Sequence, residues 1–240
     1  MIAARPVEGL PEIRPGDDLG ALLRGHAADG DVLVVAHKVV SKAEGRIVRL
    51  DDVTPSDRAL ALAAEHDKED ARHVQVVLDE TAELIRAERG VLICRTRHGF
   101  VCANAGVDAS NTEPGTVVLL PDDPDASARR LRAALGVRAA VVVADSFGRA
   151  WRHGQCDVAI GVAGLAPLDD WRGRTDAHGR ELKATWIAIA DQAAAAADLA
   201  RTKDSRQPAV VVSGLARHVT DGDGPGAAAL VRAREEDLFR

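Results

Sequence analysis

The sequence has very few aromatic residues: three Phe, three Trp and no Tyr among 240 residues. A hydrophobic core must therefore be built mainly from Ala, Val and Leu, and there is no set of rings on which nucleic-acid bases would stack. The formal net charge is −6, whereas non-specific nucleic-acid binding requires clustered Lys and Arg. We therefore expect no nucleic-acid partner.

Cysteine and long apolar runs are also scarce. The three cysteines, Cys94, Cys102 and Cys156, lack C-x-x-C spacing, which supports neither a disulfide framework nor a structural zinc site. We interpret them as reduced thiols of a cytoplasmic protein. No run approaches the ~18 apolar residues of a membrane span, and the N-terminus lacks the apolar region of a secretory signal. We therefore expect no membrane association.

Hydrophobic residues make up 46% of the chain and charged residues 28%, which is typical of a globular protein with an ample core. Apolar β-branched runs predict strands at 31–40, 46–50, 91–95, 99–103, 116–120, 139–144, 158–162 and 209–213. Helical spacing and capping residues predict helices at 17–24, 57–65, 71–86, 124–135 and 183–202, the start of the last also fitting a strand. Hairpin-like pairs and βα alternation occur together, which indicates an α+β fold (mixed α/β).

The segment VVVADSFGRAWRHGQ covers residues 141–155. A buried strand is predicted to end at Asp145, and ligands of open α/β sheets bind beyond the carboxyl ends of strands. Asp145 with Ser146 can bind a divalent metal ion, because Mg²⁺ and Mn²⁺ prefer oxygen ligands. The alternative interpretation is a helix N-cap, for which Asp and Ser are favoured.

The segment ANAGVDASN, residues 103–111, places Asp108, Ser110 and Asn111 in a small-residue loop after a predicted strand. Asp108 can share a metal centre with Asp145, and Asn111 can hold a nucleotide group. A simple polar turn needs the same residue types, so the segment by itself does not decide between the two.

Residues 37–46 read HKVVSKAEGR. Lys42 and Arg46 are predicted to follow a strand in a Gly-containing loop, where a Lys can reach phosphate groups. The Walker A spacing and the G-x-G-x-x-G spacing of dinucleotide sites are both absent. His37 falls in the predicted strand, where a core histidine with satisfied hydrogen bonds is the simpler interpretation.

Two polar segments complete the candidate site. Arg152 and Gln155 can hold a carboxylate or phosphate of the substrate, although exposed solvated side chains would give the same sequence. The segment 171–182, WRGRTDAHGREL, is Gly-rich and charged, and fits a mobile loop over a site or an ordinary surface loop.

Taken together, six stretches resemble the coenzyme F420-0:L-glutamate ligase family, also called the gamma-glutamyl ligases. They are GLPEIRPGDDL, VVSKAEGR, GFVCANAGVDASN, LLPDDPDASARRLR, ADSFGRAWRHGQCDVAIGVAGL and GDGPGAAALVR, and they run from residue 9 to residue 232. The resemblance is greatest to the ligase portion of actinobacterial enzymes. We expect a single ligase-like domain over residues 1–240, without the C-terminal flavin-binding reductase domain that many of those enzymes carry.

This resemblance implies a GTP-dependent amide ligase that adds L-glutamate to the carboxylate of F420-0 through an acyl phosphate. It also implies two divalent ions, Mg²⁺ or Mn²⁺, with K⁺ as a further candidate, and an intertwined homodimer with mixed sheets and flanking helices. By position in the matching stretches, it assigns nucleotide contacts to Leu10, Pro11, Glu12, Ile13, His37, Lys42 and Asn111. It assigns metal ligation to Asp108, Asp145 and Ser146, and catalytic roles to Lys42, Asp108 and Asp145.

Three residues depart from the family pattern. His37 stands where a small or amide residue is usual, and Trp186 and Gln192 stand where Glu is common. These departures leave two alternatives: a related GTP- and metal-dependent ligase for another carboxylate, or a nucleotide-binding module without catalysis.

Overall fold

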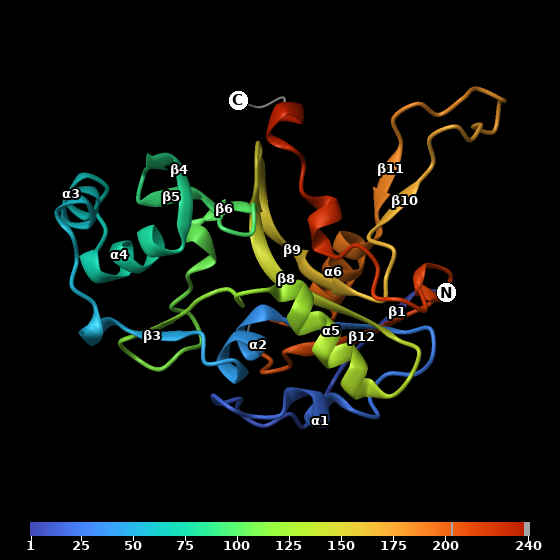
Figure 1. Cartoon of the computed structure of the whole chain (residues 1–240), viewed down its shortest axis with the longest axis horizontal. Coiled ribbons are helices and arrows are strands. Elements are labelled where there is room, and N and C mark those ends of the chain that lie inside the picture. The colour runs from blue at the N-terminus through green and yellow to red at the C-terminus, as the bar shows by residue number, and fades with distance from the viewer. Residues whose placement is uncertain (203, 238–240) are drawn as a thin grey trace.

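A five-stranded sheet forms the centre of the computed structural model, which describes residues 1–202 and 204–237 (Figure 1). Its strand order is β1 (Ala3–Pro6), β12 (Ala209–Ser213), β2 (Val32–Ala36), β8 (Ala140–Arg149) and β9 (Arg152–Ala163). The neighbours β2 and β8 run parallel, and the other pairs are antiparallel. The mixed architecture confirms the predicted α+β class.

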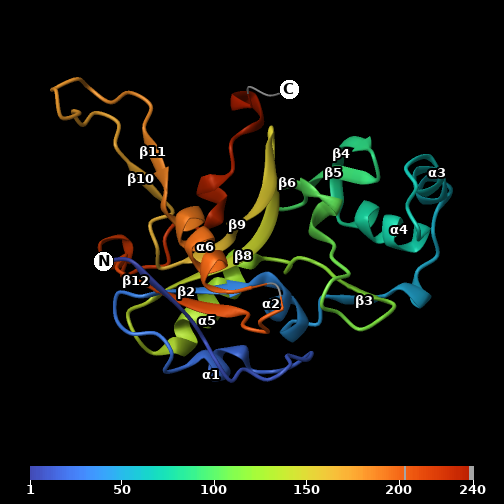
Figure 2. The ribbon, with the colours of Figure 1, turned by 180° about the vertical axis from the view of Figure 1, so that it is seen from behind.

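Both faces of this sheet are buried, and alternate residues of each strand serve different cores. Leu33 and Val141 pack with α1 (Leu19–Leu23) and α5 (Pro124–Leu135), whereas Val34 and Val142 pack with α6 (Ile189–Ala200). This follows from the two-residue period of a strand. The α6 face carries mostly Ala, so the helix lies close to the sheet, on the side opposite α1 and α5 (Figure 2).

A smaller body packs beside the sheet around its own core. It holds α3 (Asp57–Glu65), α4 (Ala71–Asp79), and the sheet β4 (Thr81–Glu88), β5 (Val91–Thr96) and β6 (Val101–Ala103). The pair β3 (Ile47–Arg49) and β7 (Thr116–Val118) connects this body to α2 (His37–Ala43). On the other side, β10 (Leu168–Asp170) and β11 (Trp186–Ala188) carry an arm that extends away from the sheet (Figure 1). Short 3₁₀ turns span Leu50–Asp52, Asn104–Gly106, Ala216–His218, Ala227–Leu230 and Arg234–Glu236.

The strand predicted at residues 31–40 is wrong in its second half. β2 ends at Ala36, and His37–Ala43 form the helix α2. The apolar run that suggested one strand continues through Val39 and Val40. The polar residues on either side of this apolar run, however, recur at helical spacing. One side of the helix α2 faces a cavity, and Val40 on another side packs into the core.

Two further boundaries differ from the predictions. The helix predicted at 71–86 ends at Asp79, because residues from Thr81 onward pair with β5. The strand predicted to end at Asp145 continues to Arg149, because β9 supplies pairing partners along its whole length. The helix Pro124–Leu135 is confirmed, and the segment 183–202 contains the strand β11 and then α6. Within the described ranges, none of the helices is long and apolar enough to cross a membrane.

Leu33 tests how much the packing of the central sheet contributes to stability. Its side chain is fully buried, whereas Leu199 on α6 is 91% exposed. We expect Leu33→Ala to lower the free energy of unfolding by about 2–5 kcal/mol, because it leaves a cavity in the core. The matched Leu199→Ala should stay within about 0.5 kcal/mol of the wild type. Urea unfolding measures both values, and equal effects would contradict this description of the core.

His218 makes stability depend on pH. Its Nε2 atom accepts a hydrogen bond from Arg217 at 2.8 Å, which requires an unprotonated nitrogen. Burial lowers the pKa of His218 below its ordinary 6.5, and the Arg217 charge lowers it further. The unfolded chain therefore binds more protons in the window below 6.5, so this contribution to stability is complete above that value and decreases as the pH falls through the window.

We expect His218→Gln to lose less free energy of unfolding than the wild type between about pH 7.5 and about pH 5.5. Glutamine keeps an acceptor for Arg217 but does not titrate. Urea unfolding at several pH values measures the difference, and parallel curves for the two proteins would refute a role for His218.

Candidate functional site

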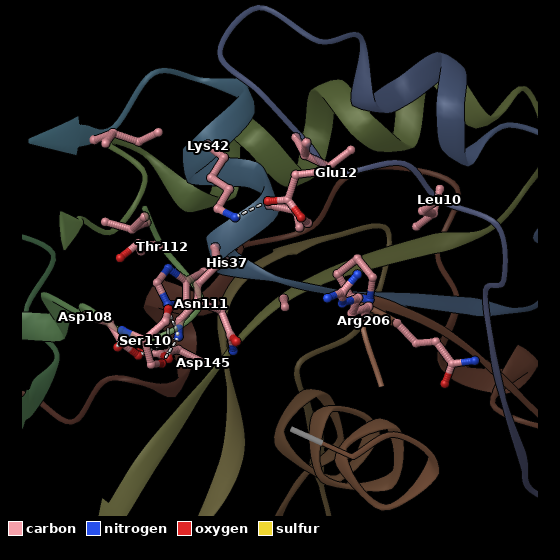
Figure 3. A pocket seen from close by; sticks show the side chains of 18 of the residues that line it. Leu10, Glu12, His37, Lys42, Asp108, Ser110, Asn111, Thr112, Asp145 and Arg206 are labelled. Carbon is pink, nitrogen blue, oxygen red and sulfur yellow. Dashed lines mark hydrogen bonds and ion pairs between the residues drawn. The ribbon is translucent and has the colours of Figure 1, made fainter. Parts of the chain in front are cut away.

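A cavity of about 1450 Å³ lies where β2 ends and its parallel pairing with β8 stops (Figure 3). Its lining comes from residues 10–15, the start and one side of α2, residues 45–49 around β3, residues 108–118, the neighbouring parts of β8 and β9, and residues 198–202 and 204–208. The carboxyl end of parallel strands is the expected position for a ligand. The cavity therefore joins segments that are far apart in the sequence.

The parallel register of β2 and β8 determines what lies at the inner end of this cavity. Ala36 pairs with Ala144, so the next residues, His37 and Asp145, come side by side. Nε2 of His37 is 3.2 Å from Oδ1 of Asp145, and the two side chains are only 2% and 15% exposed. Within the described part of the chain, neither ring nitrogen of His37 has a hydrogen-bond partner.

Helix α2 directs two ammonium groups toward carboxylates of the cavity. Lys38 and Lys42 are one helical turn apart, so they share a face of the helix. Nζ of Lys38 is 2.7 Å from Asp108, and Nζ of Lys42 is 2.6 Å from Glu12. Figure 3 shows Lys42 meeting Glu12 above the His37–Asp145 pair. The sequence prediction missed Lys38 because it placed this residue in a strand.

The loop after β6 holds Asp108 in a tight turn. Oδ1 of Asp108 accepts a hydrogen bond from the Ser110 backbone N–H at 2.6 Å, and Asn111 adopts a left-handed backbone with φ of 56°. Burial alone would raise the pKa of Asp108, but Lys38 and the Ser110 N–H outweigh it, so the pKa lies below its ordinary value. Asp108 is therefore an anion at neutral pH.

Ser146 belongs to a second polar chain on the other face of β8. Successive residues of a strand point to opposite faces, so Asp145 faces α2 while Ser146 faces the end of α6. The Ser146 hydroxyl donates to Asp157 at 2.5 Å, and Arg201 pairs with the same carboxylate at 2.6 Å. Asp157 is 2% exposed, so this ion pair is a largely buried part of the cavity wall.

The structure brings nearly all predicted site residues to this cavity. Its lining includes Leu10, Pro11, Glu12, Ile13, His37, Lys42, Asp108, Asn111, Asp145, Ser146 and Gln155. Two residues lie outside the cavity lining: Arg152, near the tip of the β8–β9 hairpin, and Trp186, on the arm. The sequence prediction missed residues 198–202 and 204–208, although the charged run after the Ala-rich helix was a usable signal.

The donor set fits a magnesium-type ion whose coordination is completed by a substrate. In the described residues, no group of three His, Cys, Asp or Glu side chains forms a ready metal cage. Asp108, Asp145 and Ser146 nevertheless offer hard oxygen donors around one cavity. Mg²⁺ is usually bound by one or two carboxylates together with substrate phosphates and water. The residues present therefore fit such an ion.

Fold and cavity together define an α+β protein with a cleft lined by side chains of both charges. The family model "F420-0:Gamma-glutamyl ligase" matches residues 9–214, and the chain belongs to this family. It is therefore an enzyme of the acid–amino-acid ligase class, as the resemblance in its sequence implied.

Relatives of this family match almost the full length of the chain. A protein of Methanothermobacter thermautotrophicus is 43% identical over 98% of this chain and 97% of its own length. Proteins of Methanopyrus kandleri and Natronomonas pharaonis are 45% and 48% identical, over 98% and 99% of this chain and 96% and 94% of their own lengths. All three are named coenzyme F420:L-glutamate ligase.

Gly106 tests how the backbone positions the Asp108 loop. It has φ of 75°, and a Cβ there would lie 2.6 Å from the Leu120 side chain. Gly115 has nearly the same φ, 76°, but a Cβ there would meet nothing within 4 Å. We expect Gly115→Ala to lower the free energy of unfolding by about 1 kcal/mol through backbone strain alone. Gly106→Ala should lower the free energy of unfolding by about 1–3 kcal/mol more than Gly115→Ala does, because the added methyl group overpacks against Leu120.

Urea unfolding of the two variants separates strain from overpacking, because they share the unfavourable backbone and differ in the contact with Leu120. Equal losses for both variants would show that Leu120 does not constrain the loop.

Proposed function

We propose that this protein catalyses the GTP-dependent addition of L-glutamate to the carboxylate of F420-0, in coenzyme F420 biosynthesis. The observation that carries the proposal is the convergence of Lys42, Asp108 and Asp145 on one cavity. The chain also belongs to a family in which a relative is named coenzyme F420:L-glutamate ligase.

Such a reaction has to activate a carboxylate, because its oxygen is a poor leaving group. A carboxylate oxygen of F420-0 attacks the γ-phosphorus of GTP, an O–P bond forms, and GDP leaves. The α-amine of glutamate then attacks the carbonyl carbon of the acyl phosphate; the amide forms, inorganic phosphate leaves and the amine proton passes to solvent. Phosphoryl transfer requires little covalent chemistry from the protein, so positioning and charge supply most of the catalysis.

The roles of the residues follow from their charges. Lys42 would exchange Glu12, which is 72% exposed, for a phosphate oxygen of GTP, and so stabilise the charge that develops in transfer. Asn111 and the segment 10–13 would hold the nucleotide, and Gln155 the acceptor, with Arg152 outside the cavity lining as a further acceptor contact. Asp108, Asp145 and Ser146 would hold two Mg²⁺ or Mn²⁺ ions, with K⁺ as a further candidate. Such ions neutralise phosphate charge when bound.

We also propose a homodimer in the cytoplasm. Trp151 is 78% exposed at the tip of the β8–β9 hairpin, and Trp186 is 51% exposed on the arm. Large exposed apolar side chains on projecting elements favour burial against another surface. The thiols of Cys94, Cys102 and Cys156 are free, which suits a reducing compartment.

The function is tested with the whole protein, GTP, Mg²⁺ or Mn²⁺, L-glutamate and F420-0. We expect GDP release together with the mass gain of one or more glutamyl residues on F420-0. Asp145→Asn and Lys42→Met should each lower kcat at least about 100-fold, because each removes a charge that acts on phosphate. The control Asp79→Asn changes an exposed carboxylate of α4 outside the cavity, and should retain wild-type turnover.

Three outcomes would contradict the proposal in different ways. GDP release only with other carboxylates would point to a related ligase with a different acceptor. GTP binding without turnover on any carboxylate would point to a non-catalytic module. Full activity of Asp145→Asn would show that Asp145 has been given the wrong role.

A further inference from the structure

His37 is a buried polar side chain whose hydrogen-bonding groups are not used. It is 2% exposed, and in residues 1–202 and 204–237 neither Nδ1 nor Nε2 finds a hydrogen-bond partner. A polar group buried without a partner costs free energy, on the order of 1–3 kcal/mol. A ligand bound at this ring would offset that cost.

The position of the ring relative to Asp145 indicates what kind of ligand this is. Nε2 of His37 lies 3.2 Å from Oδ1 of Asp145, yet the two atoms do not form a hydrogen bond among the described residues. Two neighbouring ligands of one ion, each bound at about 2.0–2.1 Å, lie about 3.0 Å apart in octahedral geometry and about 3.3 Å apart in tetrahedral geometry. The observed separation therefore has room for a single metal ion bound to both side chains.

We propose that His37 is a metal ligand beside Asp145, so that the ion bound there is coordinated by nitrogen as well as oxygen. The inference rests on the proposed function, because it takes Asp145 as a metal ligand. The neighbouring Lys38 does not compete for this place, since its ammonium group is held by Asp108 and Ser110 on the loop. The remaining coordination positions are left to phosphate oxygens and water.

This ligand changes which ion the site prefers. Imidazole suits transition metals, whereas Mg²⁺ prefers an all-oxygen shell. Because His37 adds an imidazole to the carboxylate of Asp145, an ion held between them is expected to be Mn²⁺ in preference to Mg²⁺. His37 acts here as a determinant of metal specificity.

Pulsed electron paramagnetic resonance of the whole protein with Mn²⁺ alone tests the contact directly. We expect a hyperfine coupling from an imidazole nitrogen in the wild type, which changes to the ¹⁵N pattern when histidine is ¹⁵N-labelled. The coupling should vanish in His37→Gln. It should persist in His178→Gln, which alters an exposed histidine on the arm, outside the cavity lining. His37→Asn is the second variant if His37→Gln does not fold.

Calorimetric titration with Mn²⁺ and with Mg²⁺ gives the second readout. We expect His37→Gln to bind Mn²⁺ about tenfold or more weakly and Mg²⁺ within about threefold of the wild type, because the glutamine amide offers an oxygen. An equal loss for both ions would show that His37 only orients Asp145, and would overturn the inference.

The remaining outcomes separate this inference from the proposed function. If Mn²⁺ binds and Asp145→Asn abolishes binding, but the wild type shows no imidazole coupling, His37 is not a ligand and the proposed metal site stands. If Asp145→Asn leaves Mn²⁺ binding unchanged, or no saturable Mn²⁺ binding occurs, the inference and the metal part of the proposed function both fail.

Discussion

The parallel pairing of β2 with β8 determines where every group of the cavity lies. The paired residues from Val32–Ala140 to Ala36–Ala144 are almost all fully buried and cannot slip by one position without exchanging the two cores. At the end of this pairing the two strands diverge in structure: β2 turns into α2 at His37, while β8 continues along β9. His37 and Asp145 are therefore neighbours because of the register, and α2 begins at a fixed point above them.

Among the described residues, three ion pairs of a Lys or Arg with a carboxylate line the cavity, and they differ in how easily a ligand can replace them. Glu12 is 72% exposed, so its pair with Lys42 contributes little free energy and can open for an incoming anion. Asp157 is 2% exposed, and leaving it without Arg201 would bury an uncompensated charge. Asp108 with Lys38 lies between these extremes. These differences in exposure favour entry of an anion at Lys42 and a permanent structural role for the pair of Asp157 with Arg201.

The sequence was most informative where composition and spacing had one physical explanation. The run Ala140–Ala144 is fully apolar and β-branched, and the segment 124–135 begins at an Asp-rich turn, so the helix and the buried part of the strand were predicted correctly. A shared metal centre of Asp108 and Asp145 was suggested by the segments themselves, whereas the family resemblance supported it and added Lys42 to the same site. His37 and Lys38 were misplaced because Val39 and Val40 fit both a strand and the apolar side of a short helix.

Other features depend on tertiary partners and have no local signal. The extension of β8 beyond Asp145 exists because β9 pairs with it, and the strand β4 replaces a predicted helix because β5 is beside it. The role of Arg201 depends on the depth at which Asp157 is buried. Such properties arise from the packing of elements against each other, and the sequence of one segment does not contain them.

The central claim is that one cavity, where the parallel pairing of β2 with β8 ends, holds both the nucleotide and the divalent ion. A crystal structure of the protein with GDP and Mn²⁺, with anomalous scattering recorded for manganese, tests it most directly. We predict an anomalous peak within about 2.4 Å of an Asp145 carboxylate oxygen, with the GDP phosphates beside Lys42. GDP bound outside this cavity, or manganese at no position next to Asp145, would contradict the account.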